Sequence, residues 1–97
     1  MYNRLLIIGA GGHGKVAADI AMKMQKYDEI VFLDDNEETE NCIGFRVVGK
    51  VADARNYIEG SEVFVAMGNG ETRKNLMEDL CEMGAKIATL TTYIQDY

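Results

Sequence analysis

The chain has 97 residues, with 10 Lys and Arg against 16 Asp and Glu, which gives a formal net charge of −6 at pH 7. This length suits one domain over 1–97, and the acidic balance excludes a general nucleic-acid or anionic-membrane surface, because both need basic patches. No apolar run approaches the roughly 20 residues that cross a bilayer, and no signal-peptide region is visible, so we expect a cytoplasmic protein without membrane contact.

The first predicted element is a strand over 4–8, an apolar run that leads directly into the Gly-x-Gly-x-x-Gly turn of Gly9, Gly11 and Gly14. A helix over about 13–26 follows, because apolar residues recur there at helical spacing. Strand, turn and helix together form a phosphate-binding fingerprint, which favours a nucleotide ligand. The alternative is a glycine turn that only packs the helix on the strand.

The rest of the chain alternates between short apolar runs and segments with helical spacing. We predict further strands at 30–33, 45–48, 63–67 and 86–90, and helices near 51–58 and over about 71–83. The strand at 45–48 is expected at a sheet edge, and 34–41 is expected to form a polar loop. No pattern is assigned to 91–97.

Alternating strands and helices predict a small Rossmann-like α/β fold, in which a doubly wound parallel sheet lies between helix layers in a three-layer α/β/α arrangement. By analogy with other doubly wound sheets, the order is 30–33, 4–8, 63–67, 86–90. The chain then reverses direction between the strands 4–8 and 63–67, where such folds bind ligands. The glycine turns that follow these two strands are therefore expected to flank one pocket.

Several polar residues lie at these turns. His13 either contacts a ligand or caps and orients the first turn. In the second turn, Gly68 keeps the pocket wall clear of a Cβ, and Asn69 is expected to cap the following helix. Arg73 lies in the first turn of that helix, where a cation opposes the helix dipole, so we expect a ligand phosphate or a nearby Asp to compensate it.

Asp34 and Asp35 end the second strand about 20 residues past the glycines, where this fold often holds a ribose-binding acid. Acidic residues at a strand's end are equally ordinary loop formers. Adjacent carboxylates there point in opposite directions, so we do not expect them to share a catalytic proton. Cys42 and Cys81 fit no metal-ligand or redox spacing, and we predict neither a catalytic residue nor a metal site.

Short segments of the chain also resemble a known family in their order and spacing. They are Leu-Ile-Ile-Gly-Ala-Gly-Gly-His-Gly-Lys-Val, Phe-Leu-Asp-Asp, Val-Val-Gly, and Val-Ala-Met-Gly-Asn followed by Thr-Arg-Lys. From about residue 4 to residue 90, the chain resembles the N-terminal domain of the bacterial sugar O-acyltransferases of the sialic acid O-acetyltransferase (NeuD/PglD-like) type. That family includes N-acetyltransferases acting on UDP-linked 4-amino sugars.

The resemblance implies a UDP-sugar-binding domain in which Gly12, His13 and Gly14 contact the nucleotide sugar and Gly68 forms the pocket wall. It places Asp34, Asp35 and Asn36 near the nucleoside, and the predicted substrate site is completed by Gly11, Lys15 and Asn69 from the two glycine turns.

The same resemblance assigns acetyl-CoA and the catalytic His to a C-terminal left-handed β-helix that these 97 residues do not include. We therefore expect no cofactor in this chain, and whether it is an enzyme by itself stays open. Without the trimer contacts of the β-helix, we expect a monomer or a weak dimer.

Two other functions stay open at this point. The glycine fingerprint suits an NAD(H)- or CoA-responsive sensor or interaction module equally well, although the chain supplies little more than half of a dinucleotide site unless a symmetric dimer completes it. The chain is alternatively a structural remnant whose pocket is empty.

Overall fold

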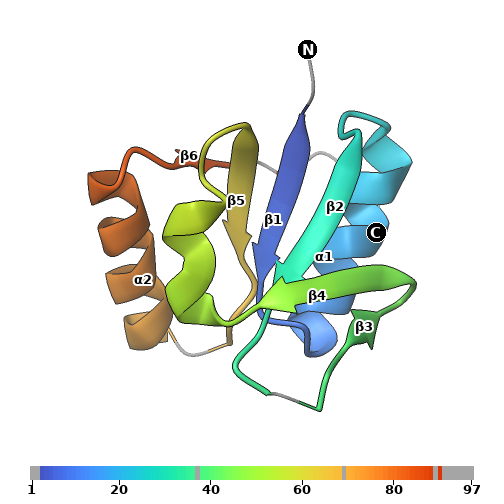
Figure 1. Ribbon diagram of the computed structural model, residues 1–97, viewed down its shortest axis with the longest axis horizontal. Helices are drawn as coiled ribbons and strands as arrows, with labels where there is room; N and C mark the ends of the chain where they lie inside the picture. Colours follow the sequence, from blue (N-terminus) through green and yellow to red (C-terminus); the bar gives the residue numbers. More distant parts are fainter. Residues whose placement is uncertain (1–2, 37, 69, 89, 91–97) are drawn as a thin grey trace.

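The computed structural model describes residues 3–36, 38–68, 70–88 and 90. In chain order its elements are β1 (Arg4–Ile8), α1 (Gly12–Met24), β2 (Glu29–Leu33), β3 (Asn41–Cys42), β4 (Phe45–Gly49), the 3₁₀ helix η1 (Val51–Asn56), β5 (Ser61–Val65), α2 (Gly70–Glu82) and β6 (Lys86–Ile87). One sheet runs through the molecule with helices packed around it (Figure 1). Among the described residues, no helix has the length and apolar character that a membrane span requires.

The strand order is β3-β4-β2-β1-β5-β6. The four strands for which an order was predicted, β2, β1, β5 and β6, are adjacent in that order, and their pairings are parallel. Leu6 of β1, for example, lies between Val31 of β2 and Val63 of β5. The chain moves to one side of β1 first and to the other side later, so the crevice of this fold lies beyond the carboxyl ends of β1 and β5.

The far side of the sheet differs from the prediction. β4 pairs in parallel with β2, and the edge position belongs to β3, which pairs antiparallel with β4 through Asn41–Arg46 and Cys42–Phe45. β3 has two residues, too few to show the alternation by which a strand is recognised in a sequence. The expectation that the strand at 45–48 forms the edge is therefore wrong by one strand.

Several element bounds also differ, most by one or two residues. The strand predicted at 63–67 is β5, which begins and ends two residues earlier, the predicted helix near 51–58 is the 3₁₀ helix η1, which ends at Asn56, and the last strand ends at Ile87 rather than at residue 90. A 3₁₀ helix is common in a short connection such as this one. The predicted position Thr89 lies outside the described residues.

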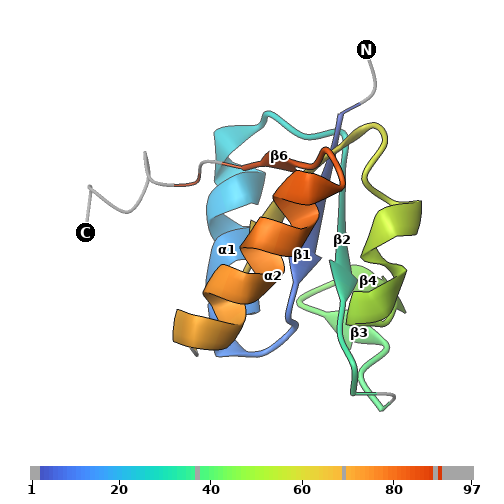
Figure 2. The same ribbon diagram turned by 90° about the vertical axis from the view of Figure 1, so that its left-hand side faces the viewer.

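The core has two parts, one on each face of the sheet, because β1 is buried on both faces. On one face, α1 packs against Leu5, Ile7 and Phe32. On the other face, Leu6, Ile8 and Val63 form a cluster with Ala54 of η1 and Leu80 of α2. Figure 2 shows α1 and η1 on opposite sides of the sheet. The predicted Rossmann-like α/β fold, with helices on both faces, is confirmed.

Candidate functional site

The first glycine turn leaves β1 between the ends of its two neighbours. The Gly9 amide donates to the Leu33 carbonyl at 2.8 Å, and the Ala66 amide donates to the Ile8 carbonyl at 2.8 Å. Gly9 has a φ of +107°, and a Cβ at this position would lie 2.7 Å from the Ala66 carbonyl oxygen. Only glycine fits so close to the end of β5 with this backbone conformation, so the tight turn predicted at Gly9 is present.

Gly14 allows helix α1 to pack directly on the turn. A Cβ at Gly14 would meet the Gly9 carbonyl oxygen and would approach the Phe32 ring to 3.1 Å. Gly14 is buried, so its part in the fingerprint is the close approach of helix and strand. The start of α1 is thereby held at the crevice.

The first turn of α1 has free backbone donors. Gly11 is the N-cap, and within the described part of the chain no side chain caps the amides of this turn. The Lys15 amide makes the first helical bond, to the Gly11 carbonyl at 3.0 Å. Gly11, Gly12 and His13 are exposed, and uncapped amides at a helix start attract an anion.

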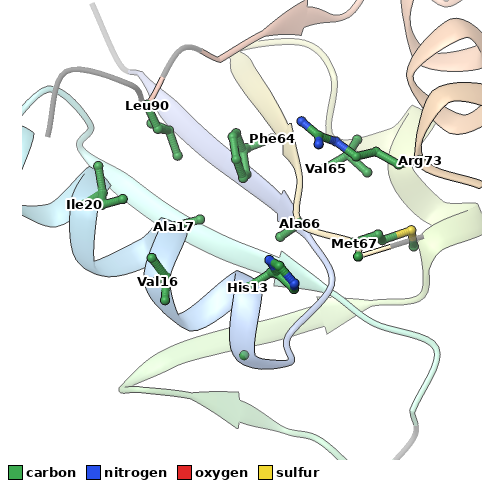
Figure 3. A pocket seen from close by; sticks show the side chains of 12 residues that line it. His13, Val16, Ala17, Ile20, Phe64, Val65, Ala66, Met67, Arg73 and Leu90 are labelled. Carbon is green, nitrogen blue, oxygen red and sulfur yellow. The ribbon is translucent and has the colours of Figure 1, made fainter. Parts of the chain in front are cut away.

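A cavity of about 480 Å³ opens beside this helix start. Its walls come from the first half of α1, the end of β5, the turn after β5 and the segment after β6, as Figure 3 shows. The lining residues are Gly12, His13, Val16, Ala17, Ile20, Phe64, Val65, Ala66, Met67, Gly68, Arg73 and Leu90. The two glycine turns therefore meet at one pocket, as the predicted strand order requires.

The polar groups of the cavity gather at one end. The His13 ring lies against Gly68, where a Cβ would be 3.4 Å from His13 Nε2. Arg73 enters from the start of α2. The structure gives Arg73 no ion pair with a described carboxylate, so compensation by a nearby Asp is not observed, and compensation by a ligand phosphate stays a prediction. An exposed imidazole and a guanidinium thus face the cavity within an acidic protein.

The opposite end of the cavity is apolar, and it was not predicted from the sequence. Val16, Ala17 and Ile20 of α1 face Phe64 of β5 and Leu90 (Figure 3). Phe64 alternates with the buried Val63 and Val65 and is itself half-buried. A single-sequence pattern gives all of these residues as core, because a core face and an apolar pocket wall have the same periodicity.

The site residues predicted on the two glycine turns differ in where they lie relative to the cavity. Gly12, His13 and Gly68 line the cavity, and Gly11 is the adjacent N-cap. Lys15 lies outside it, on a separate surface hollow with Val16, Asp19 and Ile43. Gly14 is buried beneath the turn, and Asn69 lies outside the described residues.

Asp34, Asp35 and Asn36 do not line the cavity, and their side chains bond to backbone. Asp34 accepts from the amides of Ala10 at 2.7 Å and Asn36 at 2.8 Å, and Asp35 accepts from the Val51 amide at 2.9 Å. Asn36 accepts from the Glu38 amide at 3.0 Å. The loop-forming role that carboxylates have at a strand's end is therefore observed, while contact with a nucleoside stays a prediction.

The fold and the crevice define a Rossmann-like domain with an open helix start at the topological switch point. The chain matches the family model of the PglD N-terminal domain over residues 4–80, and it belongs to this family. Among solved structures, it resembles the acetyltransferase domain of PglB from Neisseria gonorrhoeae in complex with acetyl coenzyme A, with 38% identity and a TM-score of 0.79. That match covers 88% of this chain and 42% of the other.

A second solved relative is a variant of the perosamine N-acetyltransferase from Caulobacter crescentus in complex with CoA and GDP-perosamine. The identity is 26% and the TM-score is 0.72, and the match covers 84% of this chain and 39% of the other. The chain thus spans less than half the length of the acetyltransferase chains that it matches. The resemblance to an N-terminal domain of sugar acetyltransferases is confirmed.

Proposed function

We propose that this chain is the nucleotide-sugar-binding domain of a sugar acetyltransferase. The observation that carries the proposal is the uncapped start of α1, which opens beside His13, Gly68 and Arg73 into one cavity. Backbone amides at a helix start, together with nearby cations, form a general site for a diphosphate. The perosamine N-acetyltransferase that shares this fold was solved with GDP-perosamine, which supports a nucleotide sugar as the ligand class.

Within this proposal, the diphosphate lies at the amides of Gly11, Gly12 and His13, and Arg73 supplies the charge that the acidic protein otherwise lacks. The base is proposed to be uracil, because the resemblance described above includes enzymes that act on UDP-linked amino sugars. Acyl transfer is assigned to no described residue here. We propose that it requires acetyl-CoA bound to a β-helix domain, as the family resemblance implies.

Melting temperature against a ligand panel tests the proposal: UDP, UDP-GlcNAc, GDP, CMP, NADH and acetyl-CoA. A ligand at ten times its dissociation constant adds about 1.4 kcal/mol to the free energy of unfolding, or about 5–10 °C in a domain of this size. We expect UDP compounds to raise the melting temperature selectively and His13→Ala to reduce the rise. A rise in melting temperature with NADH or acetyl-CoA alone would favour the sensor function. A rise with GDP alone would mean that the base of the ligand is guanine and not uracil.

A further inference from the structure

Ala10, in the middle of the glycine turn, is held through both of its peptide units, Gly9–Ala10 and Ala10–Gly11. Its N–H donates to Asp34 Oδ2 at 2.7 Å, and its carbonyl accepts from the Cys42 thiol at 3.5 Å. Ala10 and Cys42 are both buried. These partners come from β3 and from the residue after β2, so elements remote in sequence fix two consecutive peptides of the turn.

Asp34 is itself anchored to the sheet. Its amide donates to the Gly49 carbonyl at 3.0 Å, and its two carboxylate oxygens accept from different amides, those of Ala10 and Asn36. Cys42 belongs to the short hairpin of β3 and β4. The bonds from Ala10 to Asp34 and from Cys42 to Ala10 together form a clamp on the turn. Through Cys42, this clamp extends to β3, the edge strand that was not predicted.

The clamp on Ala10 affects the backbone amides at the start of α1, because Ala10 lies next to them in the chain. Ala10 immediately precedes Gly11, the N-cap of α1. The peptide that accepts from Cys42 also carries the Gly11 N–H, and the bond from Ala10 to Asp34 fixes the peptide before it, so together they help to set the direction of the amides of Gly11 and Gly12. Glycines leave these amides free to turn in many directions, and binding an anion would cost the entropy of ordering them. A carboxylate that orders them in the free protein lowers that cost.

We propose that Asp34 is a positioning residue that pre-orients the glycine turn for the diphosphate, rather than an acid that binds the ribose. This inference rests on the proposed function of the cavity. Electrostatics favours the positioning role, because a carboxylate near a diphosphate repels it, so its benefit to binding has to come from the backbone that it orders.

Asp34→Asn tests the inference, because one amide oxygen cannot replace both carboxylate oxygens as acceptor. The matched control is Asp28→Asn, which removes one charge from a carboxylate that accepts the Asn3 amide at 2.7 Å, at the other end of the sheet. The two probes are UDP and inorganic pyrophosphate, which has no ribose. Affinities are measured by calorimetry well below the melting temperature of every variant.

We expect Asp34→Asn to weaken the binding of UDP and of pyrophosphate by the same factor, about tenfold, since a hydrogen bond to a charged group is lost. Asp28→Asn should leave both affinities unchanged. A ribose contact would behave differently: UDP would weaken while pyrophosphate binding stayed the same or became stronger through the loss of a negative charge. Equal affinities in Asp34→Asn and the parent protein would also overturn the inference.

Amide hydrogen exchange in the free protein tests the role of Asp34 without a ligand, so its result does not depend on the proposed function. We expect faster exchange at Ala10 and shifted resonances of Gly11 and Gly12 in Asp34→Asn, and unchanged exchange and resonances at these residues would refute the clamp. If the parent protein binds neither probe, the proposed function fails while this result still decides on the clamp.

If Asp34→Asn does not fold, the pair Cys42→Ser and Cys42→Ala repeats the test, because Ser keeps a donor for the Ala10 carbonyl. The Ala variant should then bind both probes about two- to threefold more weakly than the Ser variant, and equal binding would contradict the clamp.

Discussion

The imidazole of His13, on the first turn of α1, faces Gly68 across the crevice, and a Cβ on Gly68 would lie 3.4 Å from Nε2 of the ring. This distance is an ordinary contact, so an alanine fits at residue 68 without displacing the ring. A larger side chain at the same position would enter the cavity that both residues line. The pair therefore offers a way to fill the proposed site without disturbing the core.

We predict that Gly68→Ala and Gly68→Leu both leave the melting temperature within about 3 °C of the parent value, because Gly68 is exposed. Gly68→Leu should weaken UDP-sugar binding at least about tenfold, since the side chain occupies the ligand's volume, and Gly68→Ala should weaken it less. Calorimetric titration of both variants checks this. Undiminished binding by Gly68→Leu would place the ligand elsewhere.

A different glycine tests the packing of the turn. Gly14→Ala places a methyl group against the Gly9 carbonyl oxygen and 3.1 Å from the Phe32 ring, so we expect a loss of about 3 kcal/mol in the free energy of unfolding. Gly70→Ala is the matched control, because a Cβ there meets nothing within 4 Å and the residue begins α2. Urea denaturation measures both. Equal stability of the two variants would show that α1 does not pack on the turn as described.

A substitution at Arg73 tests whether the positive charge of the site contributes to binding the phosphates. Arg73→Gln should weaken UDP about five- to tenfold while leaving the weaker binding of uridine unchanged, because only UDP carries phosphate. Removing a cation from the first turn of α2 should leave stability equal or slightly higher. Arg55→Gln, on the exposed surface of η1, serves as the control of equal charge change. Equal loss of UDP affinity in Arg73→Gln and Arg55→Gln would contradict a specific contact between Arg73 and the phosphates.

The Tyr27–Glu62 pair, at the end of the sheet opposite the cavity, makes stability depend on pH. The Tyr27 hydroxyl donates to Glu62 Oε1 at 2.8 Å, and Lys26 pairs with Glu62 at 3.2 Å. Burial raises the pKa of Glu62, but the hydrogen bonds from Tyr27 and Lys26 outweigh burial and hold it below its usual range. Burial, followed by the bond to Glu62, raises the pKa of Tyr27.

Because its folded pKa is depressed, Glu62 contributes stability above its unfolded pKa of about 4.3, and this is lost as the pH falls through the folded pKa. The raised pKa of Tyr27 gives a contribution that is present below about pH 10 and lost as the pH rises through its folded pKa. We predict that Tyr27→Phe lowers the free energy of unfolding by about 1 kcal/mol near pH 7, a figure that already allows for the partial exposure of the pair. At pH 3 the same substitution should lower it by less.

Urea denaturation at both pH values measures this difference. Tyr57→Phe is the control, because the Tyr57 hydroxyl donates to the neutral Val48 carbonyl at 3.3 Å and its loss should not vary between pH 7 and pH 3. A cost of Tyr27→Phe that stays constant over the same range would contradict the assignment.

The sequence was sufficient for the centre of the fold. The run Leu5–Ile8 and the helical spacing after it have one physical solution, a buried parallel strand followed by a helix that packs on it. The two glycine turns then converge because of the strand order alone. The edge was not predictable, because β3 has two residues and forms as a strand through its antiparallel pairing with β4.

Within the site, sequence reasoning named His13, Gly12 and Gly68, which line the cavity, while their contact with a ligand stays a prediction. It did not find the apolar wall of Phe64 and Leu90, which has the pattern of an ordinary core. It also had no means to distinguish a carboxylate that faces a ligand from one that accepts a backbone amide, as Asp34 does, since that depends on where the Ala10 peptide lies in space.

The most direct test of the nucleotide-sugar site locates the ligand on the protein. Two-dimensional ¹H–¹⁵N NMR spectra of the chain are recorded during titration with UDP-GlcNAc, up to millimolar concentration. We predict that the largest shifts occur at the amides of Gly11, Gly12, His13 and Gly68, on the two glycine turns. Shifts confined to residues away from these turns, or no shifts at any concentration of UDP-, GDP- or CMP-linked sugars, would contradict the account.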